Sequence, residues 1–291
     1  MNIIKFTGGL GNQMFYYALY RKIQRLYGNN SVVANIDFYS KSSVEFELTD
    51  VFKKTAEHLS IEANGLEKKY RKYNRIGDVL FRGHIKYLDR LVYGEKEAYV
   101  YDEDALDCKE SLFDGYWQSY RYFDDIKDEI KRDFSFTIAD KSLKDFVKRI
   151  SESKNTVVSI HIRRGDYLTF SDVYGGICTE EYYSKAINYF KEKYSELTFV
   201  FFSNDIDWVK EHMLSDEYEC IFVCQDMFDS YEDWYDMYLM SMCNHNIIAN
   251  STFSWWGAWL NENTEKIVYA PATWVHTYKA PDICPPQWVR A

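Results

Sequence analysis

A short polar segment at residues 161–167, with the sequence HIRRGDY, combines the residue types that bind phosphate. It follows an apolar run at 156–160 that has the composition of a β-strand. Arginine suits a phosphate because its planar guanidinium donates two parallel hydrogen bonds and stays charged at any working pH. Neighbouring strand residues point to opposite faces, so we expect Arg163 or Arg164 to bind the ligand and the other to hold Asp166. The alternative is an ordinary salt-bridge cluster on the surface.

A second candidate for phosphate binding lies at residues 250–254, with the sequence NSTFS. The following residues, 255–260, read as a helix, which places Ser251, Thr252 and Ser254 at its N-terminus. Backbone N–H groups and the helix dipole attract anions there. Taken alone, this segment is equally an ordinary helix cap. Together with an arginine segment on a neighbouring strand, it favours a diphosphate site.

Both segments require a sheet that brings strand ends together. Apolar runs of about five residues alternate with helical patterns in the second half of the chain, which indicates a parallel sheet covered by helices on both faces. The strands are expected near residues 156–162, 198–202, 220–224, 246–249 and 266–270. Ligands of such sheets bind beyond the carboxyl ends of the strands. Asn204, which follows the second of these strands, is therefore expected in the same cleft as the two phosphate-binding segments.

The first forty residues predict a separate strand, turn, helix and strand. A strand at 2–6 leads into a glycine-rich turn at 7–11, and Asn12 is expected to cap a helix that Gly28 ends. A second strand at 31–36 completes the βαβ unit. The charged, tyrosine-rich stretch that follows offers little pattern beyond expected helices at 67–75 and 76–92, and we expect the domain boundary near Asp140.

Composition excludes several classes of protein. The chain has 291 residues, 46% of them hydrophobic, and a net charge of -10, which argues against a nucleic-acid partner bound by bulk attraction. Aromatic residues make up 18% of the chain, enough to permit the ring platforms on which sugars stack. No apolar run is long enough to span a membrane. The N-terminal residues read directly as a strand rather than a signal peptide, so we expect a cytoplasmic protein with reduced cysteines.

Two spacings resemble metal sites, and neither is expected to bind a metal. Cys220 and Cys224 have the spacing of zinc ligands but lie in an apolar run where small thiols pack. Asp205 and Asp207 have the spacing that holds a divalent metal on a nucleotide diphosphate. Arg163 and the helix terminus already supply positive charge to such a ligand, which makes a metal redundant.

Three separated segments together resemble the inverting α1,2-fucosyltransferase family of the bacterial type, related to core α1,6- and protein O-fucosyltransferases. They are residues 8–15 (GGLGNQMF), 161–167 and 251–260 (STFSWWGAWL). The resemblance implies an α/β fold of the GT-B type, with two Rossmann-like domains and the active site in the cleft between them. It implies an acceptor-side domain at 1–140 and a GDP-sugar-binding domain at 141–291, with the last fifteen or so residues packing back on the N-terminal domain.

The resemblance also implies the chemistry and the residues that perform it. The donor would be GDP-β-L-fucose, transferred with inversion to the 2-hydroxyl of a terminal galactose without a metal or other cofactor. Arg163 resembles the arginine that binds the donor diphosphate, His161 lies beside the nucleoside and Asp236 reads the guanine edge. Asp166 orients the loop and Arg164 is structural. The full set of donor-binding residues is expected to be Gly9, Gly11, Asn12, His161, Arg163, Asn204, Asp236, Ser251, Thr252, Phe253 and Ser254.

Some points stay open at the level of sequence. The base that takes the acceptor proton is either a carboxylate near the loop at residues 9–12 or a phosphate oxygen. The absence of an N-terminal anchor suggests a bacterial, cytoplasmic enzyme of glycan or O-antigen biosynthesis, acting on free or lipid-linked galactose-terminated glycans. Any membrane association, at the inner face, would come only through the acceptor. The alternatives are a GT-B transferase for another nucleotide sugar and a non-catalytic nucleotide- or glycan-binding module.

Overall fold

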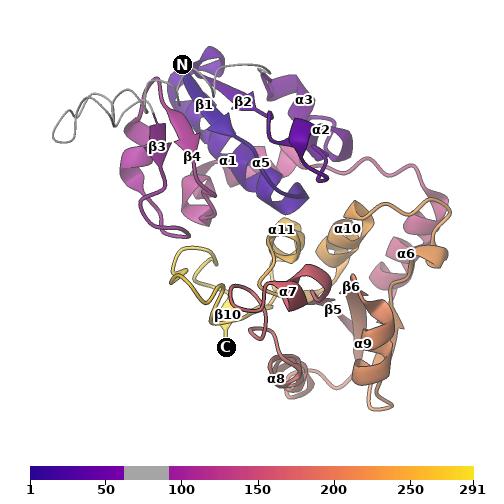
Figure 1. Ribbon diagram of the computed structural model, residues 1–291. Coiled ribbons are helices and arrows are strands. Elements are labelled where there is room, and N and C mark those ends of the chain that lie inside the picture. Colours follow the sequence, from indigo (N-terminus) through magenta and orange to yellow (C-terminus); the bar gives the residue numbers. More distant parts are fainter. Residues whose placement is uncertain (62–91) are drawn as a thin grey trace. The chain divides into compact units, whose positions relative to one another are not determined.

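The computed structural model describes residues 1–61 and 92–291 (Figure 1). They form two compact units, unit 1 (Met1–Thr137 and Ala280–Ile283) and unit 2 (Ile138–Lys279 and Cys284–Ala291). Asp140, near which the sequence places the boundary, lies just inside unit 2. Its carboxylate accepts a hydrogen bond from the Leu143 backbone N–H at 3.0 Å and caps the first helix of that unit. The helices expected at 67–75 and 76–92 lie outside the described residues, apart from Val92, which begins a strand.

Unit 1 contains a four-stranded sheet in the order β2-β1-β4-β3, with every described pair of strands parallel. Its strands are β1 (Asn2–Lys5), β2 (Val32–Asn35), β3 (Val92–Gly94) and β4 (Leu112–Asp114). Its helices are α1 (Leu10–Tyr27), α2 (Leu48–Val51), α3 (Thr55–His58) and α5 (Lys127–Asp133). The expected first strand, glycine turn, helix and second strand are all present.

The start of α1 differs from the expectation. The helix begins at Leu10, and its N-cap is Gly9, whose carbonyl oxygen accepts hydrogen bonds from the Asn12 and Gln13 N–H groups at 2.9 and 3.1 Å. The prediction that Asn12 caps the helix was therefore wrong. Gly8 adopts a φ of 75°, a conformation that only glycine takes without strain, and this lets the chain turn into the helix early.

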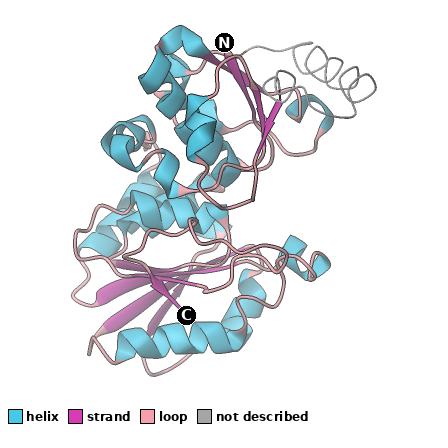
Figure 2. Ribbon diagram, turned by 90° about the vertical axis from the view of Figure 1, so that its left-hand side faces the viewer, coloured by secondary structure: helices cyan, strands magenta, loops and turns pink. Residues whose placement is uncertain are grey.

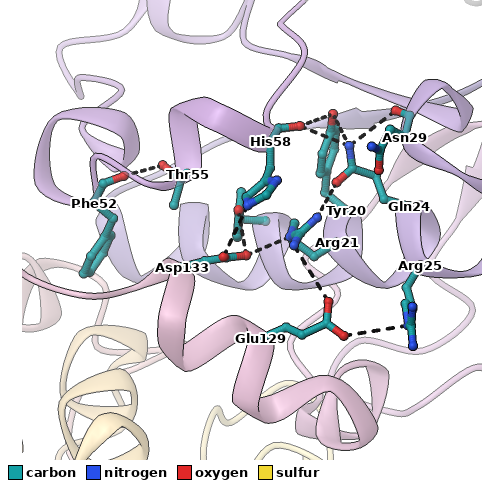
Figure 3. Close-up of polar contacts among 11 residues, drawn as sticks. Tyr20, Arg21, Gln24, Arg25, Asn29, Phe52, Thr55, His58, Glu129 and Asp133 are labelled. Atoms are coloured by element: carbon teal, nitrogen blue, oxygen red, sulfur yellow. Dashed lines mark hydrogen bonds and ion pairs between the residues drawn. The ribbon is translucent and has the colours of Figure 1, made fainter.

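A buried carboxylate joins α1, α3 and α5 in unit 1 (Figure 3). Asp133, only 5% exposed, accepts hydrogen bonds from the Arg21 Nε at 2.7 Å and from the Tyr17 hydroxyl at 3.0 Å. The Nε2 atom of His58 lies 3.5 Å from its other oxygen. Buried charges persist in proteins when they are paired and hydrogen-bonded, and this group meets both conditions.

Unit 2 contains a six-stranded parallel sheet in the order β10-β9-β8-β5-β6-β7. Its strands are β5 (Thr156–Ile162), β6 (Leu197–Ser203), β7 (Glu219–Phe222), β8 (His245–Ile247), β9 (Val268–Ala270) and β10 (Val289–Arg290). Its helices are α6 (Lys141–Ser151), α7 (Gly165–Thr169), α8 (Glu180–Lys191), α9 (Ile206–Met213), α10 (Trp234–Met242) and α11 (Thr252–Leu260). All five expected strands are present, and β10 was not anticipated.

Helices cover both faces of this sheet (Figure 2). Val158 and Ile160 of β5 pack into a core that contains residues of α8 and α9. Val157 of the same strand, with Val200 and Phe202 of β6, packs into a second core that contains residues of α6 and α10. Successive residues of a strand thus enter opposite cores, which is why these strands read as continuous apolar runs. The expected α/β class, with a parallel sheet in each of two units, is confirmed.

The strand order of unit 2 fixes where its loops can hold a ligand. Counted along the chain from β5, the order is 3-2-1-4-5-6, that of a dinucleotide-binding Rossmann fold. The chain leaves β5 toward β6 on one side and returns to β8 on the other. The connections that follow β5 and β8 leave in opposite directions, and ligands of folds with this strand order bind beyond these carboxyl ends.

The final segment of the sequence contributes to both units. Residues Ala280–Ile283 belong to unit 1, where the Asp282 carboxylate accepts a hydrogen bond from the Tyr101 backbone N–H at 2.8 Å. Residues Cys284–Ala291 return to unit 2, where β10 pairs with β9. Of the last fifteen or so residues, which the sequence suggests pack back on the N-terminal domain, Ala280–Ile283 are thus grouped with unit 1 and Cys284–Ala291 with unit 2.

Candidate active site

Three polar segments of unit 2 meet at the carboxyl ends of β5, β6 and β8. The backbone N–H of Arg164, after β5, donates to the Asn204 side-chain oxygen, after β6, at 2.9 Å. The hydroxyl of Tyr167 donates to the carbonyl oxygen of Asn250, after β8, at 2.9 Å. The ring of His161, in β5, lies 6.0 Å from the ring of Phe253, in α11. The residues that sequence analysis singled out after these three strands are therefore neighbours.

Arg164 is held within the protein. Its Nε lies 3.0 Å from an Asp205 carboxylate oxygen, and its guanidinium stacks 3.7 Å from the centre of the Trp208 ring. Asp205 also accepts a hydrogen bond from the Trp208 backbone N–H at 3.4 Å and so caps α9. The described partner of this arginine is therefore Asp205, from the neighbouring strand, where the sequence suggested Asp166. Asp166 lies in α7, and its side chain is not among the described ones.

The chain passes Asn204 so closely that glycine is required at Gly165. Its φ is +33°, and a Cβ atom added there would lie 2.2 Å from the Asn204 Nδ2. The backbone of the loop after β5 therefore lies against the side chain of Asn204, which follows β6. This approach explains why a glycine follows the two arginines in the segment.

Arg163 and His161 are ionisable side chains of the site, and the charge of Arg163 affects the pKa of His161. Arg163 is partly buried, with its guanidinium carbon 5.8 Å from the centre of the Tyr167 ring. His161 is 5% exposed, and burial, assisted by the positive charge of Arg163, lowers the pKa of His161 to about 3. The imidazole is thus neutral at physiological pH. Its Nδ1 atom is buried and has no hydrogen-bond partner among the described residues.

The N-terminus of α11 faces the same loops. Ser251 precedes the helix, and its carbonyl oxygen accepts the first helical hydrogen bond from the Trp255 N–H at 3.0 Å. Among the described contacts, the Ser251 side chain forms no capping hydrogen bond, so the ordinary cap that sequence analysis left open is not formed there. Trp255 and Trp256 are fully buried and fix the helix in place. The helix dipole therefore presents a fixed positive end to this site.

Asp236 lies in α10, which packs directly on α11. A Cβ atom on Gly257 of α11 would lie 2.9 Å from the Met240 Cβ of α10. The Oδ1 atom of Asp236 is buried and has no hydrogen-bond partner among the described residues. Burial raises the pKa of Asp236 to about 7, against the opposing effect of a hydrogen bond with Tyr231. A buried carboxylate with an unused acceptor is a candidate for binding donor groups of a ligand.

Gly9, Gly11 and Asn12 belong to unit 1, where Gly9 is the N-cap of α1 and Gly11 and Asn12 lie in the first turn of that helix. The Asn12 side-chain oxygen accepts a hydrogen bond from the Gln118 amide at 2.9 Å. Gln13, which the sequence pattern did not single out as a site residue, is fully buried. Its amide nitrogen donates to the carbonyl oxygen of Gly8 at 3.1 Å, and its amide oxygen accepts from the backbone N–H groups of Glu47 and Leu48 at the start of α2. In the sequence, the signal for this buried role is a glutamine on the apolar side of a predicted helix.

Among residues 1–61 and 92–291, no group of three or more His, Cys, Asp or Glu side chains is arranged to hold a metal ion. A bilayer-spanning helix is likewise absent from these two ranges, because none of their helices is both long and apolar enough.

Comparison with known proteins identifies the family to which this chain belongs. The model of glycosyl transferase family 11 matches residues 83–290. An alpha-1,2-colitosyltransferase of Escherichia coli is 29% identical over 99% of this chain and 98% of that protein. The O-antigen biosynthesis glycosyltransferase WbnK of Escherichia coli is 32% identical, covering 92% of this chain and 93% of its own. A galactoside alpha-(1,2)-fucosyltransferase 2 of Sus scrofa is 28% identical over 50% of this chain and 44% of that protein.

Solved structures show more distant similarity. The fucosyltransferase NodZ from Bradyrhizobium is 11% identical over 88% of this chain and 91% of that chain, with a TM-score of 0.44. POFUT1 in complex with GDP is 12% identical over 91% of this chain and 96% of that chain, with a TM-score of 0.46. The family model and the two full-length bacterial relatives decide the assignment: this chain is a glycosyltransferase and belongs to glycosyl transferase family 11.

Proposed function

We propose that this protein transfers L-fucose from GDP-β-L-fucose to the 2-hydroxyl of a terminal galactose, with inversion and without a metal, in glycan or O-antigen biosynthesis. The names of relatives support α1,2 transfer of a deoxy sugar and a galactoside acceptor. The observation that carries the proposal is that the segment with Arg163 and the N-terminus of α11 follow the adjacent parallel strands β5 and β8. Two fixed sources of positive charge there suit a diphosphate.

The reaction places its main electrostatic demand on the leaving group. As the bond between the sugar C1 and the β-phosphate oxygen breaks, negative charge develops on the diphosphate and positive charge on the sugar ring. Arg163 and the first-turn N–H groups of α11 would stabilise the diphosphate, which is the task a divalent metal performs in other transferases. The neutral imidazole of His161 adds no competing charge, and its Nδ1 is available to a hydroxyl of the nucleoside.

Asp236 would select the base. Guanine presents two adjacent N–H donors on one edge, which a single carboxylate can accept together. The unused, buried Oδ1 of Asp236 fits this task, and the guanine donors would favour the ionised form that burial opposes. Adenine, which lacks this pair of donors, would leave the carboxylate buried and unpaired.

The first test is the reaction itself. The protein is incubated with GDP-fucose and lactose, with and without EDTA, and the linkage of any product is determined. We expect α1,2-linked fucose in equal yield under both conditions. Transfer to another hydroxyl would disprove the regiochemistry, loss of transfer with EDTA would disprove metal independence, and failure across an array of galactosides would disprove the fucosyltransferase assignment.

The second test removes the proposed diphosphate ligand. Arg163→Ala should lower kcat by about a hundredfold or more, the usual effect of losing one donor to a developing oxyanion, with the Tm unchanged. Arg149→Ala is the matched control, since Arg149 lies at the surface in unit 2 with 54% of its side chain exposed. Retention of activity by Arg163→Ala would remove this residue from the diphosphate site.

A second donor is favoured by one observation. The Escherichia coli relative that aligns over almost the whole chain is named an alpha-1,2-colitosyltransferase. Colitose differs from L-fucose by the absence of the 3-hydroxyl, so the same diphosphate and base contacts serve both donors. Competition between GDP-fucose and GDP-colitose in one reaction, with the products separated by mass, distinguishes the two. A higher kcat/KM for GDP-colitose would replace fucose by colitose in the proposal.

A further inference from the structure

The loop that follows β4 in unit 1 is held in a strained conformation around an exposed tyrosine. Trp117 has a φ of 55°, a left-handed conformation that is uncommon for a bulky residue. The preceding side chain, Tyr116, is 45% exposed, although tyrosines elsewhere in unit 1, such as Tyr16 and Tyr122, are almost completely buried. Backbone strain of this kind persists where the surroundings enforce it, and it concentrates at functional sites.

Three contacts enforce the conformation. The two carboxylate oxygens of Glu95, which follows β3, accept hydrogen bonds from the backbone N–H groups of Tyr116 and Trp117 at 2.8 and 3.0 Å. Gly115 passes Glu95 so closely that a Cβ atom there would lie 2.6 Å from the Glu95 Cβ. The Trp117 ring is completely buried and lies edge-on to Phe113 at 5.3 Å. Together these contacts leave Tyr116 directed toward solvent.

The loop lies where the sheet of unit 1 can hold a ligand. In the described sheet β1 lies between β2 and β4, so the loops that follow β1 and β4 start from neighbouring carboxyl ends. Ligands of parallel sheets bind beyond the carboxyl ends of strands. One hydrogen bond joins the loop to the first turn of α1, from the Gln118 amide to the Asn12 side-chain oxygen at 2.9 Å, and the Lys5 ammonium joins the end of β1 to Asp114 at the end of β4 at 3.2 Å.

We propose that Tyr116 is the platform on which the galactose of the acceptor glycan stacks. The axial 4-hydroxyl of galactose leaves one face of the ring lined by C–H groups, and an aromatic ring with a fixed, exposed face binds such a surface. Asp114 and Lys5 lie at the end of the same strand pair and are polar groups that sugar hydroxyls can contact. Tyr116 is thus a specificity-determining residue, and this inference rests on the proposed function because it takes the acceptor to be a galactoside.

Direct binding tests the inference without the reaction. Saturation-transfer NMR with lactose, in the absence of donor, should show magnetisation transfer to the galactose C–H face from the wild-type protein. Tyr116→Ala should weaken lactose binding about tenfold, and Tyr116→Phe, which keeps the ring, should change it by less than about twofold. Tyr27→Ala is the matched control, because Tyr27 is 36% exposed at the opposite end of α1. Absence of lactose binding to the wild-type protein, or equal binding by Tyr116→Ala, would overturn the inference.

Kinetics separate this failure from failure of the proposed function. Tyr116→Ala should raise the KM for lactose about tenfold while the KM for GDP-fucose and the affinity for GDP stay unchanged. Glu95→Gln, in which one acceptor oxygen becomes a donor, should raise the KM for lactose in the same way by releasing the loop. Transfer with an unchanged KM for lactose in Tyr116→Ala would refute the platform alone. Lactose binding that depends on Tyr116, without any transfer from GDP-fucose, would refute the proposed donor alone.

Discussion

The carboxylate of Asp133 provides a sharp test of how unit 1 is stabilised. Replacing it by Asn keeps the shape of the side chain and removes its charge. With its oxygen in the place of the Asp133 Oδ2, Asn can still accept hydrogen bonds from Arg21 and Tyr17, while its NH2 group replaces the oxygen that faces His58. The substitution therefore isolates the contribution of a buried ion pair from that of packing.

The expected magnitude follows from burial. The side chains of Asp133 and Arg21 are 7% and 12% exposed, so their contact at 2.7 Å belongs with buried pairs. Breaking one such pair by removing a partner costs about 3–5 kcal/mol. Glu129, whose carboxylate lies 3.8 Å from Arg21, offsets part of this loss. We expect Asp133→Asn to lower the free energy of unfolding of unit 1 by about 3 kcal/mol.

Hydrogen exchange followed by mass spectrometry measures this loss in each unit separately. Peptides from α1 and α5 should lose protection by the predicted amount, while peptides from β5 and β6 in unit 2 should not change. Asp128→Asn is the matched control, because Asp128 is exposed in α5, the helix that also contains Asp133. This substitution should lower the free energy of unfolding by less than about 1 kcal/mol.

Two results would refute the reasoning. If Asp133→Asn costs no more than Asp128→Asn, the charge of the buried carboxylate does not stabilise the unit. If the double variant Asp133→Leu with Arg21→Met is less stable than Asp133→Asn, the loss arises from packing, because an apolar pair should be tolerated better than an unpaired buried arginine.

Three further predictions concern unit 2. Burial lowers the pKa of His161 from 6.5 to about 3, so the unfolded chain binds a proton that the folded chain does not, and stability should fall as pH falls through that window. His161→Gln should flatten this part of the profile in urea titrations at a series of pH values, and an unchanged slope would disprove the assignment. Arg164→Ala should lower the free energy of unfolding of the unit by about 1–2 kcal/mol, because it removes the stack on Trp208 and the partly exposed ion pair with Asp205. Urea titration measures this loss, and Lys210→Ala, at the surface, should show none. Calorimetry should show GDP affinity falling below pH 7, since the raised pKa of Asp236 depletes its ionised form, and Asp236→Asn should remove both this dependence and the preference for GDP over ADP.

The parallel sheet of unit 2 was predictable because its strands are buried on both faces. Strand β5 was expected at 156–162 and spans those residues, since its apolar run is bounded by polar residues at both ends. The clusters after the strands were predictable for the same reason, because parallel strands carry their carboxyl ends to one edge. Both signals, the apolar run of a strand and the polar cluster that follows it, lie within short stretches of sequence.

Long-range contacts were not predictable in this way. Arg164 pairs with Asp205, 41 residues further along the chain, because the register of β5 and β6 places the ends of these two strands side by side. The left-handed Trp117 depends on Glu95, and nothing in the residues around Trp117 indicates it. Strand β10 has only two residues and forms because β9 offers a free edge to it.

The path of the chain through the two units has a consequence for biosynthesis. Residues Ala280–Ile283 complete unit 1, and the return of Cys284–Ala291 completes the sheet of unit 2. Unit 1 therefore emerges from the ribosome long before Asp282 is available to bind the Tyr101 backbone. The contact between Asp282 and Tyr101 can form only after most of unit 2 has been translated, and a gene fragment that ends after Thr137 lacks it. A gene for unit 1 that keeps this contact would join the codons for Ala280–Ile283 to those of the N-terminal half.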